Sequence, residues 1–216
     1  TGLTMTDDLG AYTYGTGTLT PLTYVDGSLR YFVNGVLQAT PTPTADAPLT
    51  VPGIAVPAGG NALLIYETRV NSFAPLDTES TVTNTATLSG AGLTTPVQAA
   101  STVNARAAAY LTIGKAVSPA TVAENGTLTY TFTIQNYGNT AAAETDNVTV
   151  SDTFSPILKA ISVTYNGVAW TEGTQYTYNA ATGAFATTAG QITVPAASLT
   201  RDAATGAVVV TPGIST

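Results

Sequence analysis

A period-two alternation of apolar and polar residues runs through this chain and restricts it to strand-based folds. In residues 127–135, Leu, Tyr, Phe and Ile alternate with four threonines and one glutamine, and residues 81–88 carry threonine at every second position. Such a period places the two sets of side chains on opposite faces of a β-strand. No segment keeps the helical period, so the sequence predicts an all-β protein.

Many further short strands are expected between turn signals. Two Asn-Gly pairs, at 34–35 and 166–167, are each flanked by strand-like residues, which is the pattern of a two-residue hairpin turn. Many short strands joined by short turns are typical of a β-sandwich or barrel. The other strands are predicted at 22–25, 28–33, 36–39, 48–56, 62–70, 97–104, 110–117, 147–154, 161–165, 175–178, 191–195 and 207–211.

The composition removes several classes of function. The 216 residues include neither histidine nor cysteine, and 13 acidic side chains face 6 basic ones. A Ser–His–Asp triad, a thiolate nucleophile, a zinc site and a disulfide are therefore excluded. The few acids are scattered, so we expect no enzyme, no metal site and no cofactor. The absence of a basic cluster argues against nucleic-acid binding, and no apolar run approaches the ~18 residues that insert into a bilayer.

An internal repeat divides the chain into two predicted modules, residues 1–108 and 109–216. Segments in the first half match segments in the second half, in the same order along the chain. The matched pairs are 4–9 with 149–154, the Asn-Gly hairpins at 34 and 166, and 49–52 with 192–195.

The repeat is out of phase with the ends of the sequence. The first module has no counterpart of 110–117 and 127–135, and the second has none of 62–70 and 80–104. We therefore expect each module to be incomplete at one chain end, with strand edges exposed. Two explanations stay open: the chain is a slice of a longer tandem array, or neighbouring chains complete each other by donor-strand complementation.

Several segments resemble the DUF11 conserved repeat domain, which forms tandem immunoglobulin-like modules in large bacterial and archaeal surface proteins. The resemblance is carried by residues 111–119, 127–136 and 148–152 of the second module and by 80–88 of the first. It implies an immunoglobulin-like β-sandwich and an extracellular location, at the cell surface or in a surface filament. It implies no biochemical activity.

Four polar residues interrupt faces that the alternation marks as apolar. Lys115 shares a face with Leu111, Ile113 and Val117, and Asp152 shares one with Val148, Val150 and Phe154. In the first module, Asp7 lies between Met5 and Leu9, and Asn84 lies among Val82, Ala86 and Leu88. Lys and Asp are almost never fully buried unless they are paired.

One arrangement uses all of these residue types. A neutral lysine amine attacks an asparagine carboxamide, a protonated carboxyl group stabilises the developing charge, and ammonia leaves behind an isopeptide bond. Surface-protein modules of Gram-positive bacteria resemble this chain in carrying such bonds. Lys115 is the candidate nucleophile and Asp152 the assisting acid, while Asn84 and Asp7 are the corresponding residues of the first module. The alternative is an ordinary Lys115–Asp152 ion pair, with Asp7 and Asn84 bonding turn backbone.

The function that we expect from the sequence is structural. The chain would be a segment of an extracellular stalk or filament, and its partners would be copies of itself or adjacent repeats. The alternative is an adhesin module that binds a glycan or a host protein through its loops or through Trp170 with Tyr165 and Tyr176. These aromatic residues are also explained by cross-strand packing within a sheet.

Overall fold

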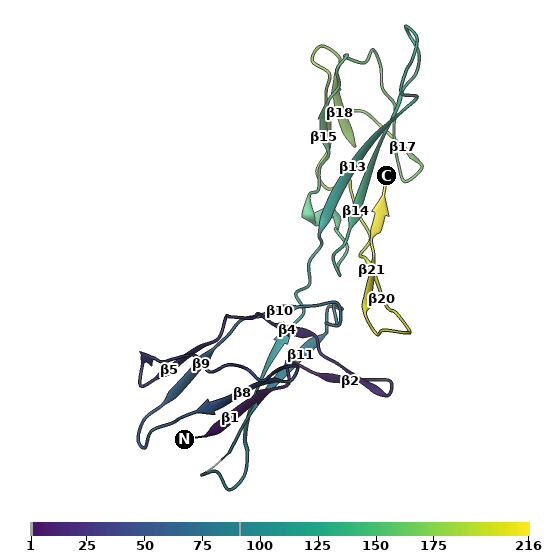
Figure 1. Cartoon of the computed structure of the whole chain (residues 1–216). Coiled ribbons are helices and arrows are strands. Elements are labelled where there is room, and N and C mark those ends of the chain that lie inside the picture. Colours follow the sequence, from purple (N-terminus) through teal and green to yellow (C-terminus); the bar gives the residue numbers. More distant parts are fainter. Residues whose placement is uncertain (1, 91) are drawn as a thin grey trace. The chain divides into compact units, whose positions relative to one another are not determined.

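The fold is all-β and is built from antiparallel strand ladders (Figure 1). The computed structural model describes residues 2–90 and 92–216. Within these residues the one helical element is a single 3₁₀ turn, Glu144–Asp146. The all-β prediction is therefore confirmed.

The chain folds as two compact units. Unit 1 contains Thr1–Arg106 and Thr200–Val209, and unit 2 contains Ala107–Leu199 and Val210–Thr216. The first boundary lies two residues from the end of the predicted module 1–108, and the segment 200–209 is grouped with unit 1. Each unit is described by itself below.

Unit 1 is organised around a five-stranded sheet with the order β12-β11-β1-β8-β7 and a three-stranded sheet with the order β6-β5-β9. Its buried core includes Leu9, Leu29, Leu49, Val51 and Ile54. The strands are β1 (Leu3–Asp7), β2 (Tyr12–Tyr14), β3 (Gly17–Leu19), β4 (Leu22–Tyr24), β5 (Arg30–Val33), β6 (Val36–Leu37), β7 (Ala45–Asp46), β8 (Leu49–Ile54), β9 (Ala62–Ile65), β10 (Thr68–Val70), β11 (Thr81–Gly90) and β12 (Val97–Asn104).

Unit 2 contains two three-stranded sheets, with the orders β13-β14-β22 and β15-β19-β18. Its core includes Ile134, Val150, Phe154, Phe185 and Val194. The strands from Leu111 onward are β13 (Leu111–Ser118), β14 (Thr129–Asn136), β15 (Ser151–Thr153), β16 (Val163–Tyr165), β17 (Val168–Trp170), β18 (Tyr176–Asn179), β19 (Ala184–Thr187), β20 (Ser198–Arg201), β21 (Val208–Thr211) and β22 (Gly213–Ser215).

Both Asn-Gly hairpins are confirmed. Asn34 and Gly35 have φ of 49° and 79°, and Asn166 and Gly167 have φ of 48° and 81°. Positive φ at both central residues is the geometry of the turn whose twist matches paired strands. The first turn joins β5 to β6 and the second joins β16 to β17.

The prediction of a strand at 191–195 is wrong. Ile192 and Val194 are buried in the core of unit 2, but this segment makes only an isolated bridge between Val194 and Ala142. The apolar and polar residues alternate here because every second side chain is buried, although the backbone does not pair in a strand ladder. The predicted strand 62–70 is also interrupted, because β9 ends at Ile65 and β10 begins at Thr68.

The two units share a local topology around one aspartate each. In unit 1, β1 pairs with β8 and β8 with β7, and Asp7 lies opposite Leu49. In unit 2, β15 pairs with β19 and β19 with β18, and Asp152 lies opposite Phe185. The counterpart of β8 is therefore β19, so matching 49–52 with 192–195 was wrong.

The Asn-Gly turns make the same tertiary contact in both units. The Asn61 N–H donates to Asn34 Oδ1 over 2.9 Å, and the Asn34 N–H donates to the Asn61 carbonyl over 3.1 Å. The Thr216 N–H donates to Asn166 Oδ1 over 3.0 Å, and the Asn166 N–H donates to the Thr216 carbonyl over 2.7 Å. The aspartates and these turns follow one another in the same order in the two units.

Candidate functional site

Asp7 is the centre of a buried polar network in unit 1. It ends β1 and is 1% exposed. Its Oδ1 accepts the Leu9 N–H over 2.8 Å, and its Oδ2 accepts the Asn84 side-chain amide over 3.0 Å and the Tyr66 hydroxyl. A buried carboxyl group is tolerated when its oxygens are bonded in this way.

Asn84 is held at both ends of its carboxamide. Its Nδ2 donates to Asp7, and its Oδ1 accepts the Gly10 N–H over 3.0 Å. Asn84 lies on β11, which pairs with β1 so that Asp7 is opposite Ala86, two residues further along β11. The amide is thus fixed against the aspartate by strand register.

Tyr66 belongs to this network although no sequence pattern indicated it. It lies in the break between β9 and β10, and its contact with Asp7 spans 59 residues of sequence. Burial of the ring raises the pKa of Tyr66 above its ordinary value, and the hydrogen bond to Asp7 and its charge raise the pKa further. The hydroxyl therefore stays protonated and donates to the carboxylate.

Lys115 and Asp152 form an ion pair in unit 2. Lys115 Nζ lies 2.5 Å from Asp152 Oδ2, with the lysine side chain 43% exposed and the aspartate side chain 18% exposed. The ammonium also lies 5.0 Å from the centre of the Tyr130 ring and 5.4 Å from that of Phe154. The aromatic rings and the carboxylate together stabilise the cation at the edge of the core.

The face of β13 that carries Lys115 is less buried than its pattern indicated. Ile113 lies opposite Ile134 and Val117 opposite Tyr130 on β14, so both are on the side of the sheet that faces the core. Nevertheless Ile113 is 57% exposed and Val117 is 44% exposed. The expectation that these residues are buried is wrong, because β13 is the outermost strand of its sheet and pairs with β14 alone among the described residues.

The structure brings each candidate residue to the aspartate of its own unit. Asn84 is bonded to Asp7 and Lys115 to Asp152. The two aspartates occupy equivalent places in the β7-β8-β1 and β18-β19-β15 arrangements. One position of the repeat thus binds an asparagine amide in one unit and a lysine amine in the other.

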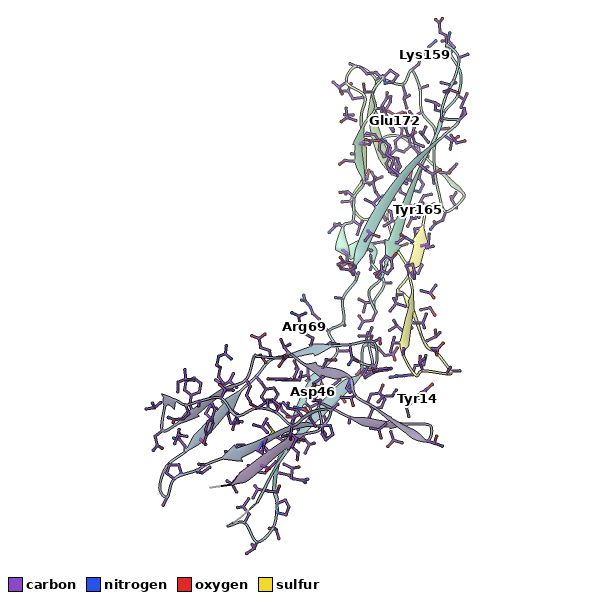
Figure 2. All side chains as sticks on the ribbon, in the orientation of Figure 1. Tyr14, Asp46, Arg69, Lys159, Tyr165 and Glu172 are labelled. Carbon is purple, nitrogen blue, oxygen red and sulfur yellow. The ribbon has the colours of Figure 1, made fainter. Side chains whose placement is uncertain are left out.

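The aromatic residues proposed for glycan stacking lie at the core of unit 2. Tyr176 is buried and lies 5.9 Å from Phe185, centre to centre. Trp170 is half-buried, with its ring 4.9 Å from that of Tyr165. Tyr165, labelled in Figure 2, donates its hydroxyl to the Thr193 carbonyl. These contacts are those of cross-strand and core packing.

Asn136 is a buried polar residue of unit 2 that the pattern did not single out. Its Oδ1 accepts the N–H groups of Tyr110 and Gly138 over 3.0 and 2.9 Å. Its Nδ2 donates to the carbonyls of Thr140 and Pro195 over 2.8 and 3.0 Å. The carboxamide therefore ties the end of β14 to three other segments of backbone.

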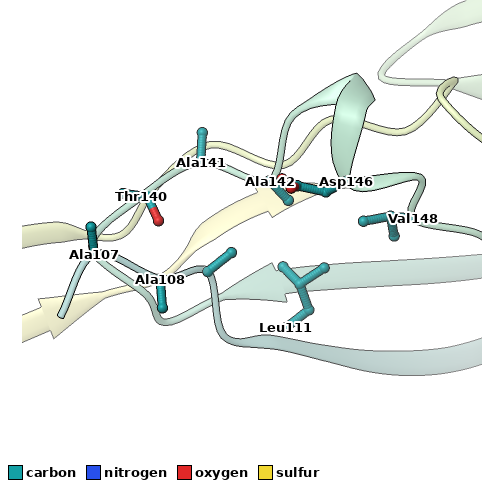
Figure 3. Close-up of a pocket in the computed structure, with 9 residues that line it drawn as sticks. Ala107, Ala108, Leu111, Thr140, Ala141, Ala142, Asp146 and Val148 are labelled. Atoms are coloured by element: carbon teal, nitrogen blue, oxygen red, sulfur yellow. The ribbon is translucent and has the colours of Figure 1, made fainter.

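A shallow hollow in unit 2 is lined mainly by alanine side chains (Figure 3). The charged group in its lining is Asp146, whose Oδ2 accepts the Ala143 N–H over 2.8 Å. Across residues 2–90 and 92–216, no three acidic side chains gather as a metal site would require. The same residues contain no helix long and apolar enough to cross a bilayer.

Comparison with known proteins finds no matching protein-family model, no matching curated protein and no matching solved structure.

Proposed function

We propose that this chain is a structural, non-catalytic segment of an extracellular surface stalk or filament, built from repeated immunoglobulin-like modules. The observation that carries the proposal is the equivalence of Asp7 with Asp152 and of the Asn34 turn with the Asn166 turn, in the same order. Modules of one kind placed in a row give a chain its length while each folds largely through local contacts. The resemblance to the DUF11 conserved repeat domain supports the extracellular location.

The long ladders and the surface composition support a load-bearing role. The β11–β12 ladder and the β13–β14 ladder each contain eight registered residue pairs. Force applied along such strands is shared by many parallel hydrogen bonds. The chain has 6 lysine and arginine residues among 216, so trypsin-like proteases find few cleavage sites in it.

A Lys–Asn isopeptide bond is the proposed means of closing each repeat. The two aspartates hold equivalent places, and the Lys115 amine contacts Oδ2 of one while the Asn84 carboxamide contacts Oδ2 of the other. In a repeat that carries both residues, the amine and the amide are thereby positioned for condensation. The bond would prevent extension of the module as a disulfide does, in a chain without cysteine.

Antibody labelling of intact cells tests the proposed location. Antibodies raised against the purified chain should label unpermeabilised cells of the source organism, on the surface or along filaments in electron micrographs. Labelling that requires permeabilisation of the cells would contradict the proposal.

A further inference from the structure

We propose that the edge of β15 facing away from β19 is an acceptor site for an extended strand of the β11 type, supplied by another repeat of the same kind. The bound strand places its asparagine beside Lys115 and Asp152. This inference rests on the proposed structural function and names the partner of the same residues.

Unit 1 contains the occupied form of this site. There β1 lies between β8 and β11, and the β1–β11 ladder runs from Leu3 opposite Gly90 to Asp7 opposite Ala86. In unit 2 the equivalent strand β15 pairs with β19, and no second partner of β15 is found in the described part of the chain. Its other edge corresponds to the edge of β1 that β11 occupies and has no ladder partner among those residues, while the Thr153 N–H is bonded to Asp152 Oδ1 over 2.9 Å.

The uncovered side chains beside this edge match a β11-type strand. Lys115 lies between Ile113 and Val117 on the core-facing side of β13. The Lys115 side chain is 43% exposed, and the residues Ile113 and Val117 are 57% and 44% exposed. In unit 1, Ala86 and Leu88 of β11 pack against the core. A strand with this alternation would cover the apolar side chains, and residues 80–90 bring no charged group to the Lys115–Asp152 pair.

Strand register places the reacting groups together. Antiparallel pairing with the residue corresponding to Ala86 opposite Asp152 puts the asparagine in the position that Asn84 has relative to Asp7, where its amide donates to Oδ2 over 3.0 Å. The Lys115 amine already lies 2.5 Å from Asp152 Oδ2. The amine and the carboxamide then contact the same carboxyl group.

The covalent step needs no co-reactant. The bound strand removes water from the ion pair, which favours moving its shared proton from Lys115 to Asp152. The neutral amine attacks the side-chain carbonyl carbon of the asparagine, and the bond from that carbon to the amide nitrogen breaks. Ammonia leaves with a hydrogen that passes from the attacking amine through Asp152, and the carboxyl group keeps the proton that it received from the lysine in the first step. A secondary amide joins the Lys115 side chain to the side chain of the bound strand's asparagine.

A synthetic peptide with the sequence of residues 80–90 tests the site on the whole chain. The peptide should bind, and the intact mass of the protein should increase by the mass of the peptide less one ammonia. Lys115→Arg should bind the peptide and lose the adduct. Lys159→Arg is the matched control, because Lys159 is the other lysine of the chain and lies exposed in the loop between β15 and β16 (Figure 2); it should keep the adduct.

Peptide variants separate binding from chemistry. A peptide with alanine in place of Asn84 should bind without an adduct, and a scrambled peptide should not bind. Absence of binding would overturn the acceptor edge, and binding of the parent peptide without an adduct, or an adduct that survives Lys115→Arg, would overturn the covalent step. The antibody labelling of cells is independent of these outcomes, so failure here is distinguishable from failure of the proposed surface function.

Discussion

Asp7 and Asp152 stand at the same position of two similarly folded strand arrangements, yet they hold different partners. Asp7 lies opposite Leu49 and binds the Asn84 amide, whereas Asp152 lies opposite Phe185 and binds the Lys115 amine. Their environments also differ, because Asp7 is 1% exposed and the Asp152 side chain is 18% exposed. This difference gives matched pairs of variants with opposite expectations.

Replacing the two aspartates by alanine should affect stability unequally. Asp7→Ala leaves the Leu9 N–H, the Tyr66 hydroxyl and the Asn84 amide without their acceptor, and should lower the free energy of unfolding of unit 1 by about 3 kcal/mol. Asp152→Ala removes a partly exposed ion pair and should cost unit 2 less than about 1 kcal/mol. Urea unfolding of each variant measures the difference. Equal losses would contradict the assignment of a buried network to Asp7 alone.

Tyr66 should make unit 1 sensitive to alkali. Burial and the bond to Asp7 raise the pKa of Tyr66 in the folded chain, so the unfolded chain releases this proton first, near the ordinary value of about 10. The stabilisation is fully present below that pH and is lost as the pH rises above it. Between about pH 9 and about pH 11, the wild type should lose more stability than Tyr66→Phe. Parallel loss in both proteins would show that Tyr66 does not cause the alkaline sensitivity.

Asn136→Ala should destabilise unit 2 by about 3 kcal/mol, because four backbone groups lose their buried partner. Asn179→Ala serves as the control. Asn179 is exposed and its Oδ1 accepts the Ala181 N–H, so the loss should stay below about 1 kcal/mol. Thermal or urea unfolding of the two variants checks this, and similar midpoints would argue against the role given to Asn136.

The two hairpin turns should respond alike to a methyl group. Gly35→Ala and Gly167→Ala meet no neighbouring atom within 4 Å but force a side chain into positive φ, at a cost of about 1 kcal/mol each. Gly114→Ala on β13 also meets open space, without positive φ, and should be close to neutral. Unfolding midpoints measure all three variants. A neutral result at either turn would contradict the shared turn geometry.

Local sequence features predicted local structure well. The alternating segment 81–88 lies within β11, and the alternating segment 127–135 overlaps β14 from Thr129 onward. The Asn-Gly pairs form the hairpin turns. These features depend on residues close together in the chain. Strand β19 was not predicted because Ala184–Thr187 is short and carries one large apolar residue, so its place in the sheet depends on β15 and β18.

Tertiary relationships were less accessible from the sequence. Period two shows that Ile113, Lys115 and Val117 share a face, but not whether another strand covers that face. Likewise Tyr66 contacts Asp7 from the break between two strands. Asn136 is the last residue of β14, and the alternation that predicts this strand does not include it. The partners of both residues lie in segments that no local pattern connects to them.

The state of Lys115 in the protein isolated from the cells that make it decides whether the repeats are covalently closed. Trypsin cleaves after free lysine, so a Lys–Asn bond predicts no cleavage at Lys115 and a peptide from Ala107 to Lys159 joined to an asparagine-bearing strand peptide, lighter by one ammonia. Recovery of Lys115 entirely in the ordinary linear peptide 107–115 would contradict the proposal that Lys115, assisted by Asp152, is covalently bonded to an asparagine.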